Sequence, residues 1–250
     1  MPRFAHGPVE LDFLDEGQGE SILLVHGFAS TKEINWVQPG WIDTLTRAGR
    51  RVVALDNRGH GQSTKLYHPR DFHTDRMAED AGALLDYLGI SRADLMGYSM
   101  GARICAFLAV RRPALARSLI IGGLGIKLVT GVGLPESIAE ALEAPSLEDV
   151  HEATGKMFRA FAEQTKADRK ALAACIRGSR QTLTRSEAAS INAPVLIAVG
   201  SQDPIAGSAE DLAAIIPRAQ VLEITGRDHM LAVGDKIFKQ GTLKFLLERA

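Results

Sequence analysis

Short apolar runs alternate with longer segments whose apolar residues recur at helical spacing, and this alternation extends along most of the chain. Six of the short runs are typical of buried strands: Ile22 to Val25, Val52 to Leu55, Leu95 to Gly97, Ser118 to Ile121, Val195 to Val199 and Val221 to Ile224. Val9 to Leu14 alternates polar and apolar residues, which is typical of an exposed edge strand. Helical patterns occupy Gly40 to Ala48, Arg76 to Leu88, Met100 to Val110, Ser208 to Ile216 and Lys236 to Arg249. The alternation predicts an α/β fold with a doubly wound, mostly parallel sheet.

The strand pattern stops between Gly125 and Ile191. Three helical patterns replace it: Ser137 to Leu142, Val150 to Phe161 and Arg169 to Ile176. We therefore expect an α/β core made of residues 1–124 and 191–250, and a small helical cap made of residues 125–190. The cap follows the carboxyl end of a strand, where open parallel sheets bind ligands. This position indicates that the cap is a lid that covers a cleft. A helical bundle remote from any site is the alternative.

The composition is that of one globular unit. With 250 residues, of which 46% are hydrophobic and 24% charged, the chain is long enough to bury one large core. Its formal net charge is −1, from 29 basic and 30 acidic residues, and no long run carries one sign. This balance disfavours nucleic acid and anionic membranes as partners and favours a small, roughly neutral ligand. For the assembly we expect a monomer or a homodimer.

The cysteines and the apolar stretches indicate the cellular compartment. Cys105 and Cys175 are the two cysteines, and each lies in a helical apolar pattern, so we expect buried, reduced thiols rather than a disulfide. The segment Met1 to Gly7 lacks the apolar core of a secretory signal. The longest apolar stretch, Ser118 to Leu134, is interrupted by Lys127 and by glycines. We therefore expect no membrane-spanning segment and a cytoplasmic location.

The segment Gly97-Tyr98-Ser99-Met100-Gly101 has the G-x-S-x-G pattern of a nucleophile elbow, between a strand-like run and a helix-like run. In such an elbow the serine sits on a sharp strand-to-helix turn, and the glycines allow close approach of the neighbouring backbone. Ser99 is therefore the candidate nucleophile. The amide of Met100 would lie at a helix N-terminus, where an unpaired donor and the helix dipole stabilise developing negative charge.

A serine nucleophile needs a neighbouring base, and the base needs an orienting carboxylate. After an elbow of this kind the acid comes first and the histidine second, each following a strand. Asp203 and His229 each follow a strand-like run, and of the seven histidines only His229 lies beyond Asp203. Ser99, Asp203 and His229 are thus predicted to form a catalytic triad. Asp228 is a rival acid, disfavoured because adjacent residues on a turn rarely direct their side chains at each other.

A second oxyanion donor is expected from the loop after an early strand. The loop His26-Gly27-Phe28 follows such a strand, and the amide of Phe28 is the candidate. His26 is expected to hold this loop by hydrogen bonds rather than to act as a base. The glycine-containing segment Asp56 to Ser63 lacks the third glycine or the lysine of a nucleotide loop, so we interpret it as a turn that supports the cleft. No metal-ligand spacing occurs, and we expect neither a metal nor a cofactor.

The elbow, the His26-Gly27-Phe28 loop, the Asp56 to Ser63 turn, Asp203 and His229 together resemble the α/β-hydrolase superfamily over essentially the whole chain. The resemblance implies a mostly parallel eight-stranded sheet, an antiparallel first hairpin and a helical cap inserted after the sixth strand. Within the superfamily the chain is similar to small capped serine esterases and lactonases.

We therefore expect a serine hydrolase that cleaves small to medium uncharged carboxylic esters through an acyl-enzyme on Ser99. The candidate pocket residues are Trp36, Tyr98, Met157, Phe158, Phe161, Met230 and Leu231. The cap members of this set either line the pocket or pack on the core. One alternative is a carbon–carbon bond hydrolase for vinylogous diketones, with Arg103, Arg159 or Lys127 holding a substrate carboxylate. The other is a ligand receptor on the hydrolase fold without turnover.

Overall fold

A computed structural model describes residues 2–249. Its eight strands form one sheet in the order β1-β2-β4-β3-β5-β6-β7-β8. The strands are β1 Arg3–His6, β2 Val9–Glu16, β3 Glu20–Val25, β4 Arg50–Leu55, β5 Ala93–Tyr98, β6 Ala116–Gly122, β7 Val195–Gly200 and β8 Ala219–Ile224. β2 pairs antiparallel with both β1 and β4, and all the other neighbours are parallel. The prediction of a mostly parallel eight-stranded sheet with an antiparallel first hairpin is confirmed.

Both edges of the sheet differ from the sequence prediction. Val9 to Leu14, expected at an exposed edge, lies in β2, because the short strand β1 pairs with it and forms the edge instead. The opposite edge is β8, which the sequence predicts as buried. β8 has only β7 beside it, and most of its residues are exposed or half-buried; Val221 retains 39% of its accessible surface.

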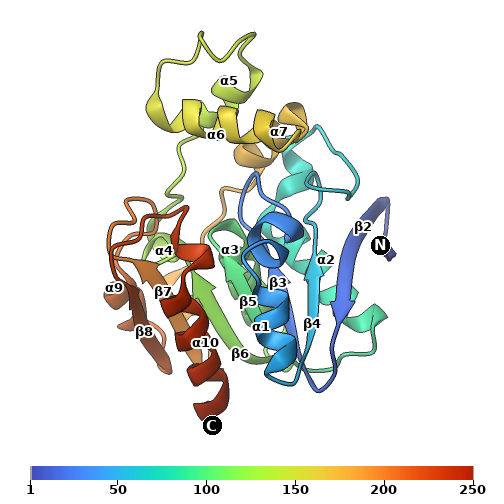
Figure 1. Cartoon of the computed structure of the whole chain (residues 1–250), viewed down its shortest axis with the longest axis vertical. Helices are drawn as coiled ribbons and strands as arrows, with labels where there is room; N and C mark the ends of the chain where they lie inside the picture. The colour runs from blue at the N-terminus through green and yellow to red at the C-terminus, as the bar shows by residue number, and fades with distance from the viewer. Residues whose placement is uncertain (1, 250) are drawn as a thin grey trace.

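Helices cover both faces of the sheet (Figure 1). One face carries α1 (Trp41–Arg47) and α10 (Lys236–Glu248), and the other carries α2 (Thr74–Tyr87), α3 (Met100–Arg111) and α9 (Ala209–Ala213). The strands between them alternate accordingly. In β3, Ile22 and Leu24 pack with the α1 side, whereas Leu23 and Val25 pack with the α3 side. A strand covered on both faces is apolar throughout, which explains the continuous apolar runs in the sequence.

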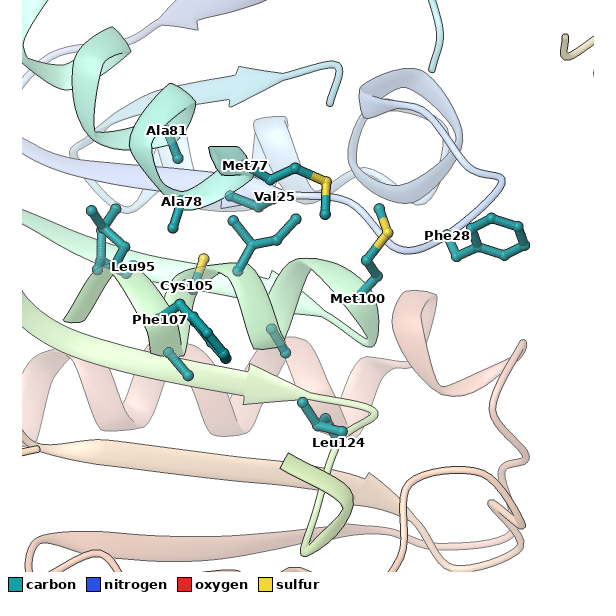
Figure 2. Packing of buried hydrophobic residues seen from close by; sticks show 14 of the residues in the cluster. Val25, Phe28, Met77, Ala78, Ala81, Leu95, Met100, Cys105, Phe107 and Leu124 are labelled. Atoms are coloured by element: carbon teal, nitrogen blue, oxygen red, sulfur yellow. The ribbon is translucent and has the colours of Figure 1, made fainter. Parts of the chain in front are cut away.

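The larger core lies between the sheet, α2 and α3. Figure 2 shows Met77 and Ala78 of α2 facing α3 close to Val25 and to Cys105. Cys105 and Cys175 are both buried free thiols, as the sequence predicts. In the described part of the chain, no helix is both long and apolar enough to cross a membrane.

Five helices and no strand separate β6 from β7 within the described residues. They are α4 Lys127–Thr130, α5 Ser137–Glu143, α6 Ala153–Gln164, α7 Arg169–Gly178 and α8 Arg185–Ala189. In Figure 1, α5, α6 and α7 stand together above the end of the sheet at which the parallel strands finish. Two of these helices have an acidic N-cap residue. The side chains of Glu152 and Asp168 accept hydrogen bonds from the first free backbone amides of α6 and α7.

Candidate active site

Ser99 stands on a sharp turn between β5 and α3, in a backbone conformation (φ 53°, ψ −111°) that residues with side chains rarely adopt. The two glycines of the motif make this turn possible. A Cβ on Gly101 would stand 2.0 Å from the carbonyl oxygen of Val25, and one on Gly97 would stand 2.2 Å from the backbone of Gly101. The close approach of β3, β5 and α3 therefore requires glycine at both positions.

The side chains of Ser99, His229 and Asp203 form a continuous chain of hydrogen bonds. His229 Nε2 lies 3.0 Å from Ser99 Oγ, and His229 Nδ1 lies 2.7 Å from Asp203 Oδ2. The side chains of His229 and Asp203 retain 7% and 0% of their accessible surface. An ionised carboxylate only accepts hydrogen bonds, so Nδ1 carries the proton and Nε2 is left to accept one from Ser99. The structure thus brings together the three residues that the sequence selects from distant segments.

The two carboxylates near His229 have separate partners. Asp203 follows β7, and its Oδ1 accepts hydrogen bonds from the amides two and three residues further on, at 2.8 and 3.1 Å. This turn holds the carboxylate so that Oδ2 faces His229. Asp228 makes the same kind of turn, accepting from the amides of Met230 and Leu231 at 3.0 and 2.9 Å. The carboxylate of Asp228 therefore binds backbone amides of its own loop, whereas Asp203 is the partner of His229 Nδ1.

Two backbone amides beside Ser99 have no acceptor among residues 2–249. One belongs to Met100, the first residue of α3, and the other to Phe28, in the loop after β3. A Cβ on Gly27 would stand 3.2 Å from the carbonyl oxygen of Tyr98 and 3.6 Å from Ser99 Cβ, so this loop passes directly beside the elbow. Both candidate oxyanion donors are therefore available next to the serine.

His26 holds the loop that carries Phe28. Its Nδ1 donates to the carbonyl oxygen of Gly27 at 2.8 Å, and its Nε2 accepts from the amide of Asn57 at 3.0 Å. Burial is the main cause that lowers the pKa of His26, so the ring stays neutral and can keep both bonds. This agrees with the structural role predicted for His26.

The turn from Asp56 to Ser63 forms hydrogen bonds with the segment that follows this loop. Asp56 accepts hydrogen bonds from the amides of Lys32 and Gln62, each at 2.9 Å, and from the buried Lys32 ammonium at 2.9 Å. His60, at the middle of the turn, accepts from the amide of Ala29 at 3.3 Å. Ala29 and Lys32, which follow the oxyanion loop, are thereby tied to one buried imidazole and one buried carboxylate.

The buried imidazole of His60 is expected to make the free energy of unfolding depend on pH in acid. Burial lowers the pKa of His60 from 6.5 to about 3. Between these pH values the unfolded chain binds a proton that the folded chain excludes, so the free energy of unfolding falls as the pH falls, by on the order of 1 kcal/mol per pH unit. We expect His60→Gln to flatten this dependence, measured by denaturant unfolding between pH 6.5 and pH 3. An unchanged slope in the variant would contradict the assignment.

A cavity of about 320 Å³ opens onto Ser99 and His229. Five of the predicted pocket residues line it: Tyr98, Phe158, Phe161, Met230 and Leu231. Phe158 and Phe161 come from α6, so this helix contributes directly to the wall. A larger and more polar cavity of about 930 Å³ adjoins it through Ser30, Ile34 and Phe161, but none of the triad residues lines it. We therefore associate substrate binding with the smaller, mostly apolar cavity.

Two of the predicted pocket residues lie elsewhere. Trp36 is fully buried in the core under α1, where its ring meets Trp41 edge to face at 6.1 Å. Met157 retains 39% of its accessible surface and does not line the cavity. On an α-helix, adjacent residues are rotated by about 100°, so Met157 points away from the face that Phe158 presents.

The sequence does not single out seven of the residues that line the cavity: Ser30, Ile34, Asn35, Pro39, Leu134, Val233 and Gly234. Asn35 lies on a π-helical turn, Glu33–Val37. A turn of five residues is too short for periodicity to predict, although π-helical turns are frequent at functional sites.

Two of the three basic residues considered for a substrate carboxylate, Arg103 and Arg159, are engaged with the protein. Arg103 donates to the carbonyl oxygens of Lys127, Leu128, Gly131 and Gln181, at 2.7 to 3.2 Å. It therefore ties both connections of the helical insertion to α3. Arg159 pairs with Glu163 at 2.6 Å and donates to carbonyl oxygens at the end of α5. The side chain of Lys127 does not line the 320 Å³ cavity.

The remaining reactive groups have structural environments. Burial raises the pKa of the Cys175 thiol to about 12 and raises that of Cys105 further, so neither is a thiolate near neutral pH. Among residues 2–249, no three His, Cys, Asp or Glu side chains stand close enough together to hold a metal ion.

Comparisons with known proteins agree with this fold. The family described as alpha/beta hydrolase fold matches residues 20–126. A non-heme chloroperoxidase of Kitasatospora aureofaciens is 26% identical over 95% of this chain and 96% of its own length. A 3-oxoadipate enol-lactonase of Acinetobacter baylyi is 32% identical over 62% of each chain. The crystal structure of a hydrolase from Pseudomonas aeruginosa has a TM-score of 0.81 and 25% identity, covering 98% of this chain and 97% of its own.

The eight-stranded sheet, the elbow and these similarities define an α/β hydrolase. The chain is a member of the α/β-hydrolase superfamily. The matches to curated relatives that are at least 30% identical cover between 29% and 62% of those proteins' own lengths. The members named above differ in the reaction that their names describe, so the reaction of this chain is argued from its own site.

Proposed function

We propose that this protein is a serine-dependent carboxylic ester hydrolase that forms an acyl-enzyme on Ser99. The observation that carries the proposal is the chain of hydrogen bonds from Ser99 through His229 to Asp203. It supplies a nucleophile, a base in reach of the serine proton and a carboxylate that fixes the base, which are the parts that acyl transfer needs.

In the acylation step, Ser99 Oγ attacks the ester carbonyl while His229 Nε2 takes the serine proton. The carbonyl oxygen becomes an oxyanion, which the amides of Phe28 and Met100 stabilise. Asp203 stabilises the imidazolium through the proton on Nδ1. His229 then gives the Nε2 proton to the leaving alkoxide, and the alcohol departs.

In the deacylation step, water attacks the acyl-enzyme along the same path. His229 Nε2 accepts a proton from the water, the second tetrahedral intermediate collapses, and the proton returns to Ser99 Oγ as the acid leaves. No metal or cofactor takes part in these steps. The base needs to be neutral at the start of each half-reaction, because Nε2 accepts a proton in both.

The cavity supports the choice of substrate. About 320 Å³ is at the small end of the range for ligand pockets, which favours esters of small to medium size. Its wall includes the aromatic rings of Phe28, Phe158 and Phe161. No Asp, Glu, Lys or Arg side chain lines it among the described residues, which favours an uncharged substrate. We assign α5, α6 and α7 the role of a lid, since α6 supplies part of the wall.

Labelling with a fluorophosphonate tests the proposal. This reagent phosphonylates a serine that a neighbouring histidine has activated, so we expect a single labelled peptide that contains Ser99. The site is identified by peptide mass spectrometry, and heat-denatured protein serves as the control because it lacks the triad geometry. Labelling spread over several serines, or none, contradicts the proposed nucleophile.

A panel of nitrophenyl esters graded by acyl length complements the labelling. We expect turnover of the short and medium esters. Labelling at Ser99 without turnover of any ester favours the receptor alternative. Turnover restricted to dienoic ketoacids favours the carbon–carbon hydrolase alternative, whose carboxylate partner the engaged Arg103 and Arg159 do not supply.

A further inference from the structure

Asn35 lines the cavity next to Ser99, and its side-chain Nδ2 donates no hydrogen bond to any group in residues 2–249. Its Oδ1 accepts from the amide of Gly27 at 2.7 Å. An amide donor requires the oxygen on that side, so the orientation of the Asn35 amide is fixed and Nδ2 is directed away from Gly27. Asn35 Oδ1 and Ser99 Cβ both lie 3.6 Å from the point where a Gly27 Cβ would stand. Asn35 and Ser99 therefore flank the same short loop and line the same cavity.

The turn that carries Asn35 is rigidly held. Trp36, the next residue, is fully buried and packs against Trp41 in the core under α1. The backbone N–H of Asn35 donates to the carbonyl oxygen of Thr31 at 3.0 Å. Successive residues thus have different tasks, because Trp36 anchors the π-helical turn and Asn35 is presented to the cavity.

Ser30 supplies a second polar group at the same wall. It is 5% exposed, lines both adjoining cavities, and its Oγ has no hydrogen-bond partner among the described residues. Buried polar groups in proteins nearly always have a partner, and those without one are explained by a ligand, a water or an unassigned role. Five polar side chains line this wall among the described residues. Ser99 and His229 belong to the triad, and the phenol of Tyr98 donates to the carbonyl oxygen of His229. The other two are Ser30 and Asn35.

We propose that Asn35, assisted by Ser30, is a specificity-determining residue that selects esters carrying a second, uncharged carbonyl oxygen near the scissile ester group. Asn35 Nδ2 donates to that oxygen, and the apolar wall holds the carbon skeleton. An ester without the second oxygen leaves Nδ2 desolvated and unpaired when it fills the cavity, which lowers its rate. This inference rests on the proposed ester hydrolysis and adds the substrate class to it.

Two pairs of esters test the inference, one for each side of the ester bond. The acyl pair is nitrophenyl 4-oxopentanoate and nitrophenyl pentanoate, and the alcohol pair is 2-oxopropyl acetate and propyl acetate. The ratio of kcat/KM within a pair is measured for the wild type and for Asn35→Asp, which keeps the oxygen that Gly27 needs and removes the donor. Dividing one ratio by the other cancels the intrinsic reactivity of each ester.

We expect the wild type to prefer the oxo ester of at least one pair by about five- to tenfold relative to Asn35→Asp. Ser30→Ala should weaken the same preference. Asn192→Asp, the same substitution at an exposed position away from the cavity, should keep the wild-type ratio. If Asn35 only positions the Gly27 loop, both esters of a pair slow equally and the ratio stays constant, which overturns the inference.

A binding measurement separates this inference from the proposed function. Calorimetry on Ser99→Ala, with and without Asn35→Asp, gives the affinity for each ester of a pair without turnover. Tighter binding of the oxo ester that Asn35→Asp abolishes supports the role of Asn35 even if the wild type cleaves no ester. Equal binding of the two esters by Ser99→Ala overturns it even if the wild type is an active esterase. If Asn35→Asp does not fold, as judged by circular dichroism, the same comparisons with Ser30→Ala decide.

Discussion

Ser99→Ala is expected to lower kcat for nitrophenyl esters by about 10⁴ to 10⁶, because triad members act as a unit and the remaining groups only bind and polarise the ester. The substitution removes Oγ and leaves Cβ in place, so the strained turn between β5 and α3 gains no new contact. The free energy of unfolding should therefore change by less than about 1 kcal/mol. Steady-state kinetics gives the first value, and denaturant unfolding gives the second.

Ser190→Ala is the matched control for this prediction. Ser190 is exposed at the end of α8, and its hydroxyl donates to the carbonyl oxygen of Glu187 at 2.7 Å, away from the cavity. We expect its kcat to equal that of the wild type. A Ser99→Ala variant that retains more than about a tenth of the activity would show that a different group attacks the ester.

The three side chains that the structure joins by hydrogen bonds can be selected from the sequence, because each lies beside a local feature with its own signature. The elbow needs glycine at 97 and 101, where a side chain would meet backbone. Asp203 and His229 follow strands whose apolar runs are easy to recognise, and their order in the chain removes most of the freedom of choice. The distances among the three side chains depend on how β5, β7 and β8 lie in one sheet, which only the structure gives.

The sheet edges are harder to predict because they depend on neighbours rather than on local pattern. β1 has four residues, too few to show alternation, and yet it pairs with β2 and displaces it from the edge. Val221 to Ile224 has the composition of a buried strand, although no further strand covers its outer side. Burial of a strand is thus decided by what packs beside it.

The pocket shows the same limit at the level of single side chains. Met157 and Phe158 are adjacent, yet one faces solvent and the other faces the cavity. Asn35 and Trp36 are also adjacent, and the aromatic ring that the sequence favours is buried while the amide is presented to the cavity. Rotation about a helix axis by one residue reverses such an assignment, and hydrophobicity alone does not fix that rotation.

Asp203→Asn is expected to lower kcat by about 10⁴ by changing the tautomer of His229. The turn after β7 requires an acceptor for the amides of Ile205 and Ala206, so the asparagine keeps its oxygen there and turns its NH₂ group toward His229. Nδ1 must then accept a hydrogen bond, which moves the imidazole proton to Nε2. In this tautomer Nε2 donates to Ser99 Oγ and is unable to take its proton.

Asp228→Asn distinguishes the two acids. The Asp228 turn needs only the acceptor that binds the amides of Met230 and Leu231, and asparagine keeps that oxygen, so kcat should change by less than about threefold. Steady-state kinetics on the two variants with one nitrophenyl ester measures both effects. A larger loss for Asp228→Asn than for Asp203→Asn would assign the orienting carboxylate to Asp228. NMR of the imidazole nitrogens provides a spectroscopic check, since the proton should be on Nδ1 in the wild type and on Nε2 in Asp203→Asn.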